Sequence, residues 1–147
     1  MKAERLDDAA RVFAEAAELV AAVMGSDHPD YAVMVRSQAD VLLRKDQCAQ
    51  ALPLYWQADA LLSPLLQDNP SYWDMHRRIA HCQRRTGDLD AAAARIEKVL
   101  TTQQRLLQPD HRLRQFAVKE GISIHTLTGD STRLAQLQAQ LTRTAED

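Results

Sequence analysis

The stretch GSDHPDYAVM, residues 25–34, separates two apolar runs of helix-forming residues, and two similar stretches follow further along the chain. They read QDNPSYWDMH at residues 67–76 and LQPDHRLRQF at residues 107–116. A break that recurs at a fixed spacing of this length is typical of an array of helical repeats. The spacing is 41 and then 42 residues, counted between Pro29, Pro70 and Arg112.

The composition favours helices over strands. The chain has 23 alanines but only 4 glycines and 5 prolines, and leucine, arginine, glutamine and glutamate, all good helix formers, supply much of the remainder. With 147 residues, 46% of them hydrophobic, the chain is long enough for one compact domain or one short repeat array. The sequence therefore predicts an all-α fold.

Each unit begins with a helix of about four turns, here called helix A. Ten residues after the proline-like position stand Ala39, Ala80 and, in the third unit, Ile122. A small side chain at such a position allows a neighbouring helix to approach closely. We expect Ala39 and Ala80 to lie at close helix contacts.

A turn follows each helix A, at Asp46, Gly87 and Gly129, because aspartate and glycine favour turns. A second helix, helix B, begins after it, so that each unit is an antiparallel helix pair. The expected array has an opening B-type helix at residues 5–24, then repeats at 29–67, 70–108 and 112–143, the last including a C-terminal cap.

The first helix B carries two prolines and an aromatic pair. Pro53 lies near its start, where the missing N–H costs little, so we expect the helix to continue through it. Pro64 is expected to kink or end the last turn. Successive helical residues diverge by about 100°, so with Tyr55 facing inward, Trp56 should be less buried.

Four segments resemble the tetratricopeptide repeat (TPR) family, in the long-repeat, kinesin light chain-like variety that also occurs in bacterial repeat proteins. They are GSDHPD (25–30), ALPLY (51–55), TGDLDAAAARI (86–96) and QPDH (108–111). The resemblance covers nearly the whole chain and implies a right-handed α-solenoid of antiparallel helix pairs that binds another protein. Asp46 and Arg112 depart from the family pattern, which has glycine and proline there.

The sequence gives no indication of an enzyme. It contains no HExxH, no GxSxG, no glycine-rich phosphate loop and no paired-cysteine signature. We therefore expect no catalytic activity, no metal and no cofactor. The histidines fall in the linkers (His28 and His111) or on A helices, where we expect them to line the groove or the surface (His76, His81 and His125).

Charge and hydropathy favour a cytoplasmic protein. The acidic N-terminal segment lacks the features of a secretory signal, the run LVAAVMG is too short to cross a bilayer, and we expect no membrane partner. The net charge of −2 and the isoelectric point near 6.2 argue against nucleic acid, despite paired arginines at 77–78 and 84–85. Cys48 and Cys82 are isolated, and we expect both thiols to be reduced.

The TPR resemblance implies that the A helices line a concave groove. These helices carry net charges of +1 (30–45), +3 (71–85) and +2 (112–127), which leaves −8 for the rest of the chain. We predict a basic groove that binds an acidic peptide segment of a partner, so the chain would act as a scaffold or adaptor. The family's groove positions are Arg36, Asp40, Arg44, Asp74, Arg77, His81, Arg84, Phe116, Lys119 and Ser123.

Two alternatives to this adaptor prediction stay open. One is that Asp40 and Asp74 neutralise the arginines, which then simply solvate the helix faces. The other is a sensory or regulatory module whose groove receives a signalling peptide or a small anionic ligand and changes curvature.

The opening helix carries a wide apolar surface. Leu6, Phe13 and Val20 lie on one face with Met24, and further apolar residues lie beside them at 12, 19 and 23. One neighbouring helix is too narrow to cover this surface. Three explanations for this apolar surface stay open: the chain self-associates through this helix, it continues in a longer array, or a partner docks on the helix.

Overall fold

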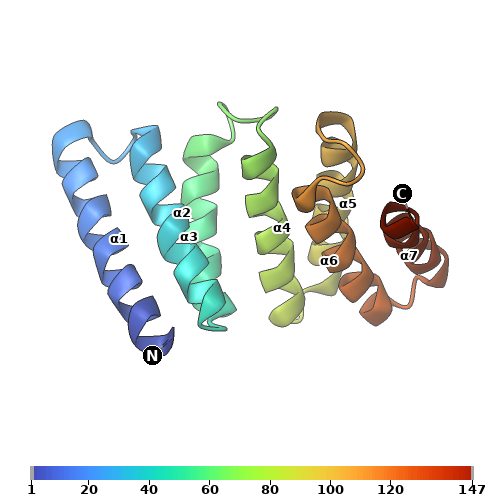
Figure 1. Cartoon of the computed structure of the whole chain (residues 1–147). Coiled ribbons are helices and arrows are strands. Elements are labelled where there is room, and N and C mark those ends of the chain that lie inside the picture. The colour runs from blue at the N-terminus through green and yellow to red at the C-terminus, as the bar shows by residue number, and fades with distance from the viewer. Residues whose placement is uncertain (1, 147) are drawn as a thin grey trace. The chain divides into compact units, whose positions relative to one another are not determined.

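The computed structural model describes residues 2–146, and the side chains of residues 2–141 and 143. Every regular element in this part of the chain is an α-helix (Figure 1). In order they are α1 (Lys2–Met24), α2 (Pro29–Arg44), α3 (Cys48–Leu62), α4 (Pro70–Arg85), α5 (Leu89–Leu106), α6 (Arg112–Thr128) and α7 (Ser131–Glu146). The predicted all-α class is confirmed.

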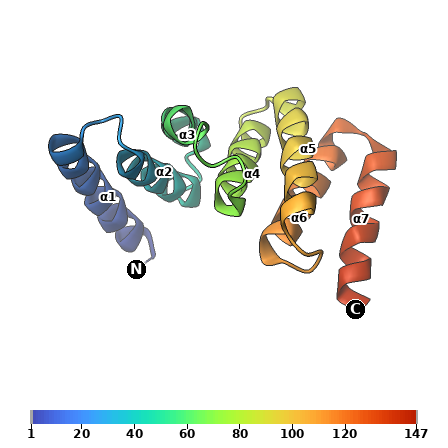
Figure 2. The same cartoon turned by 90° about the horizontal axis from the view of Figure 1, so that it is seen from above.

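The helices form two compact units that divide between Gln67 and Asp68. In the first unit, α2 packs against both α1 and α3. In the second unit, α5 packs against α4 and α6, α7 packs against α6, and α6 also contacts α4. Figure 2 shows successive helices of each unit running back and forth as antiparallel neighbours.

The turn within each helix pair uses a left-handed residue. Asp46, Gly87 and Gly129, which the sequence register aligns, have φ angles of 58°, 92° and 80°. At the first turn, the N–H of Gln47 donates to the carbonyl of Leu42 at 2.8 Å. This bond satisfies a carbonyl at the helix end in the way of a Schellman motif. The register residues are therefore the ones at which the backbone reverses.

Side chains cap the start of each helix A. His28 and His111 accept backbone N–H groups through Nδ1 at 3.1 Å in both cases, from Asp30 and Leu113. Asn69 caps α4 in the same way, accepting from the N–H two residues on at 2.9 Å. The two histidines of the linkers are thus N-caps, although the residues usually found at this position are serine, threonine, aspartate and asparagine.

Small residues lie where helices meet. Ala39 and Ala80 are fully buried. In the third pair the small residue is Gly121, where a Cβ atom would lie 2.9 Å from Cδ1 of Leu137 and 3.4 Å from Cδ1 of Leu100. The aligned residue, Ile122, is only half-buried. The register is therefore shifted by one residue in the third helix pair.

The features predicted for the first helix B are confirmed. Helix α3 runs through Pro53 and ends at Leu62, two residues before Pro64. Tyr55 is fully buried, whereas Trp56 is 39% exposed. Cys48 and Cys82 (the latter on α4) are both buried.

The opening helix leaves much of its apolar surface uncovered within its unit. Val12, Leu19, Val23 and Met24 are 55%, 65%, 73% and 53% exposed, and Ala17 is the residue of α1 that is buried. What covers this surface stays a prediction. No helix among residues 2–146 is both long enough and apolar enough to span a membrane.

Candidate partner-binding surface

The ten predicted groove residues divide between the two units. Three of them lie on α2 of the first unit, namely Arg36, Asp40 and Arg44. The other seven lie on α4 and α6 of the second unit, which pack against each other. Each group is described by itself.

On α2, the aspartate has a partner inside its own unit. The hydroxyl of Tyr55 on α3 donates to Oδ1 of Asp40 at 2.6 Å. A buried tyrosine needs such an acceptor, so Asp40 joins α2 to α3. Arg36 is half-buried and Arg44 is exposed in the last turn, where a cation interacts favourably with the helix dipole.

At the N-terminal half of α4, a buried carboxylate holds two arginines. Asp74 is 5% exposed, and its oxygens lie 2.7 Å from Nε of Arg77 and 3.2 Å from Nε of Arg78. Because burying an unpaired carboxylate is costly, these two arginines offset the cost of burying Asp74. The alternative in which Asp74 pairs with arginines is thus part of the structure.

The guanidinium of Arg77 also contacts an aromatic ring on α6. Its Cζ atom lies 5.3 Å from the centroid of the Phe116 ring, and Cζ of Arg112 lies at the same distance of 5.3 Å. Both distances are within the range of cation–π contacts. The half-buried phenylalanine therefore contacts one arginine of α4 and one arginine of its own helix.

At the C-terminal half of α4, a buried glutamate of α6 joins the two helices. Glu120 is 7% exposed; its oxygens lie 2.7 Å from Nε of Arg84 and 3.1 Å from Nδ1 of His81. Burial raises the pKa of Glu120, but the hydrogen bonds and charges of His81 and Arg84 outweigh it and lower this pKa overall. This glutamate, together with its partners, is the second ionic contact of the α4–α6 surface.

His81 has two competing contacts at one nitrogen. Its Nδ1 lies 3.1 Å from Oε2 of Glu120 and 3.1 Å from Nη2 of Arg84. Because a ring nitrogen donates only where it carries a hydrogen, Nδ1 donates to Glu120 in one tautomer and accepts from Arg84 in the other. The imidazole can thus change partner without moving.

The other two predicted residues of α6 have different surroundings. Lys119 is exposed, whereas the hydroxyl of Ser123 donates to the backbone carbonyl of Lys119 at 3.2 Å. The prediction missed Glu120, although it follows Phe116 by four residues and therefore shares its helix face. That spacing was the signal available in the sequence.

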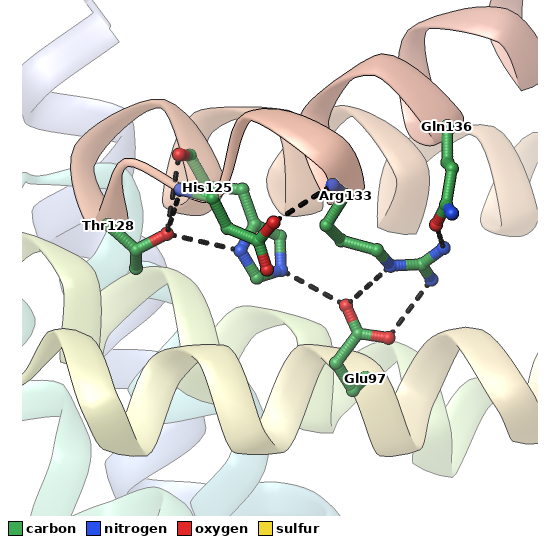
Figure 3. A network of polar contacts seen from close by, with 6 residues as sticks. Glu97, His125, Thr128, Arg133 and Gln136 are labelled. Atoms are coloured by element: carbon green, nitrogen blue, oxygen red, sulfur yellow. Dashed lines mark hydrogen bonds and ion pairs between the residues drawn. The ribbon is translucent and has the colours of Figure 1, made fainter.

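A second network, which the sequence did not predict, joins α5, α6 and α7 (Figure 3). Glu97 accepts from Nε and Nη2 of Arg133 at 2.9 and 3.0 Å and lies 3.0 Å from Nε2 of His125. Burial raises the pKa of Glu97, but the bonds and charges of Arg133 and His125 lower it overall. The network joins α7 to α5 and α6.

Two histidines are placed differently from the prediction. His125 and His76 were expected at the groove or the surface, but they are only 5% and 6% exposed. His76 contacts Nη1 of Arg95 and packs against the rings of Tyr72 and Trp73. Their burial places both in the packing of the second unit. Among the described residues, no three His, Cys, Asp or Glu side chains are placed to hold a metal.

The helix pairs, their left-handed turns and their buried small residues define a TPR-like helical repeat protein. Solved structures support this class. A Podosopora anserina protein described as a kinesin light chain with nearly identical TPR-like repeats is similar over 97% of this chain and 68% of its own, with 19% identity and a TM-score of 0.73. A variant of that protein gives a TM-score of 0.74 at 19% identity, over 98% of this chain and 70% of its own.

BtubC from P. vanneervenii is similar with a higher TM-score, 0.84, at 15% identity. The similarity covers 97% of this chain, which spans 57% of the BtubC chain. The predicted resemblance to kinesin light chain-like repeats and the predicted α-solenoid class are confirmed by these structures. No protein-family model and no curated protein sequence match the chain.

Proposed function

We propose that the chain is a cytoplasmic adaptor that binds an acidic peptide segment of a partner protein and catalyses no reaction. The observation that carries the proposal is the Phe116 ring, with the guanidinium groups of Arg77 and Arg112 each 5.3 Å from its centroid. An aromatic anchor beside guanidinium groups suits a peptide with one apolar residue between carboxylates.

The ionic contacts of the α4–α6 surface refine the kind of binding. Asp74 holds Arg77 and Glu120 holds Arg84, so these two arginines are fixed in place before a partner arrives. A guanidinium has five N–H donors, and one carboxylate accepts two of them at most. A partner carboxylate can therefore bind beside the internal one, at a lower entropic cost than on a mobile side chain.

Lys119 and Arg112 are the exposed cations of this surface. They attract an acidic segment through solvent, so the interaction weakens as salt is added. The rest of the groove predicted from the sequence, on α2, belongs to the same proposal. There Arg36 and Arg44 would contact carboxylates of the partner within the first unit.

A peptide display selection on the whole chain tests the proposal. We expect selected peptides to be rich in aspartate and glutamate around one apolar residue. Reversing two charges with Lys119→Glu and Arg112→Glu should weaken them at least about tenfold, because both cations are exposed and lie beside the anchor. The melting temperature should change little, since exposed charges contribute little to stability.

Arg105→Glu is the matched control, because Arg105 is an exposed arginine on α5 of the same unit, paired with Asp68 at 2.9 Å. It should leave peptide affinity unchanged. Selected peptides without an excess of acidic residues, or equal binding by the double variant and the parent chain, would contradict the proposal.

A further inference from the structure

A polar cavity lies in the second unit, away from Phe116 and its arginines. It is bounded by the end of α5, the start of α6 and the last turns of α7, and its volume is about 320 Å³. The polar residues around it are two arginines and three glutamines: Arg114, Arg143, Gln104, Gln115 and Gln140. A volume near the lower end of the range for ligand sites suits a small metabolite rather than a drug-sized molecule.

A smaller cavity of about 30 Å³ shares Gln104, Arg114 and Gln140 with the first and reaches deeper, to Gln103. Gln103 is fully buried. Neither its Oε1 nor its Nε2 atom has a hydrogen-bond partner in the part of the chain that the structure describes. A buried amide without partners is destabilising, so its position next to a cavity indicates that something else completes its bonds.

The two arginines have carbonyl partners. Nη1 of Arg114 donates to the carbonyl of Leu107 at 3.0 Å, and Nε of Arg143 is 3.5 Å from the carbonyl of Ala139. Neither arginine forms an ion pair with a carboxylate among the described side chains, residues 2–141 and 143. The larger cavity is thus lined by two positively charged side chains, and the small cavity beside it is lined by an amide that has both a donor nitrogen and an acceptor oxygen.

We propose that this cavity binds a small molecule that carries a carboxylate at one end and an amide or hydroxyl group at the other. The carboxylate lies between Arg114 and Arg143, because guanidinium groups bind carboxylates through paired N–H donors. The other polar group reaches Gln103 and completes its hydrogen bonds. The carboxylate is that of a free metabolite or of a peptide C-terminus, which present the same chemistry to the two arginines.

N-acetylglutamine is a suitable probe, since it has a carboxylate, an amide and a size that suits the cavity. The measurement is the shift of the Gln103 side-chain amide in ¹⁵N–¹H spectra of the whole chain during titration. We expect a saturable shift and a higher melting temperature at saturation. N-acetylglutaminamide, which lacks the charge, should bind at least about tenfold more weakly.

Four variants separate binding from folding. Arg143→Gln alters an exposed side chain and Arg114→Gln a half-buried one, and each should weaken the probe about tenfold or more, while Arg105→Gln should not. Gln103→Leu should melt at a higher temperature than the parent without probe, because it removes an unpaired amide. The same variant should lose most of the rise in melting temperature that the probe causes in the parent.

An acetylated tetrapeptide ending in glutamine distinguishes the two sources of the carboxylate. If it binds at least tenfold more tightly than N-acetylglutamine, the ligand is a peptide C-terminus; if it binds no better, the ligand is a free metabolite. The proposal is wrong if the Gln103 amide does not shift with either probe. It is also wrong if the acid and the neutral amide bind equally, or if Arg143→Gln and Arg114→Gln both leave affinity unchanged.

Discussion

The two units follow one repeat pattern but are held together by different interactions. In the first unit, α2 and α3 are joined by the hydroxyl of Tyr55 on Asp40 and by the amide of Gln57 on the hydroxyl of Tyr31, and the ion pair of Lys45 with Asp7 involves an exposed carboxylate. In the second unit, carboxylates with arginine and histidine partners join α4 to α6 and α5 to α6 and α7. The repeat pattern therefore fixes where helices meet, and the residues between the helices decide how each unit responds to charge and pH.

The largest expected effect is on the second unit, from Glu120→Gln. This change leaves Arg84 and His81 facing a neutral amide in a place where only 7% of residue 120 is exposed. Breaking a buried ion pair is strongly destabilising, and because the two partners are partly exposed we expect a loss of about 2 to 3 kcal/mol. Native-state hydrogen exchange of α4 and α6 amides measures it.

Glu97→Gln is the matched control, because Glu97 has the same kinds of partner but a side chain that is 39% exposed. We expect it to cost within about 1 kcal/mol. Amides of α2 and α3 should exchange as in the parent in both variants. A loss at Glu97 as large as that at Glu120 would contradict the view that burial sets the difference.

The next largest effect concerns the buried small residue that both units have on a helix A. Ala39 and Ala80 are both fully buried on a helix A. Replacing either with leucine overpacks the contact and should cost about 1 to 3 kcal/mol. Urea unfolding monitored by circular dichroism measures the loss, with Ala49→Leu on the exposed side of α3 as the control. An Ala80→Leu variant as stable as the parent would contradict the shared register.

Low pH should destabilise the second unit before the first. Because the pKa values of Glu120 and Glu97 are lowered in the folded chain from the ordinary glutamate value of 4.5, the contribution of these carboxylates to stability is fully present above about pH 4.5. It is lost as the pH falls through the lower folded values. We expect α4–α7 amides to lose protection as the pH falls below about 4.5, before α2 and α3 amides do. Glu120→Gln should make the protection of these amides depend less on pH.

The sequence predicted the helices and turns well because they depend on local chemistry. A positive φ needs glycine or a short polar residue, which is why Asp46, Gly87 and Gly129 could be aligned before their φ angles were known. Likewise, the contrast between Tyr55 and Trp56 follows from helical geometry alone.

The ionic contacts between different helices could not be predicted in the same way, because each joins residues far apart in the sequence. Glu120 meets Arg84 across 36 residues, and Glu97 meets Arg133 across the same separation. Net charge per helix showed an excess of arginine on the A helices but not which carboxylate each arginine faces. Counting from the helix start aligns Ile122 with Ala39 and Ala80, but the residue at the close contact is Gly121.

The smallest effect tests the turn that the two units share. Asp46 holds a φ of 58°, where Gly87 holds 92° at the same place in the second unit. A side chain in this region is strained and glycine is not, so Asp46→Gly should stabilise the first unit by about 0.5 to 1 kcal/mol. The reciprocal change Gly87→Asp should destabilise the second unit by a similar amount, since a Cβ at residue 87 meets no atom within 4 Å and only the backbone opposes it. Thermal melts of the two variants measure both effects. If Asp46→Gly lowers stability, the aspartate side chain contributes more to the turn than its backbone strain costs, and the two turns are not equivalent.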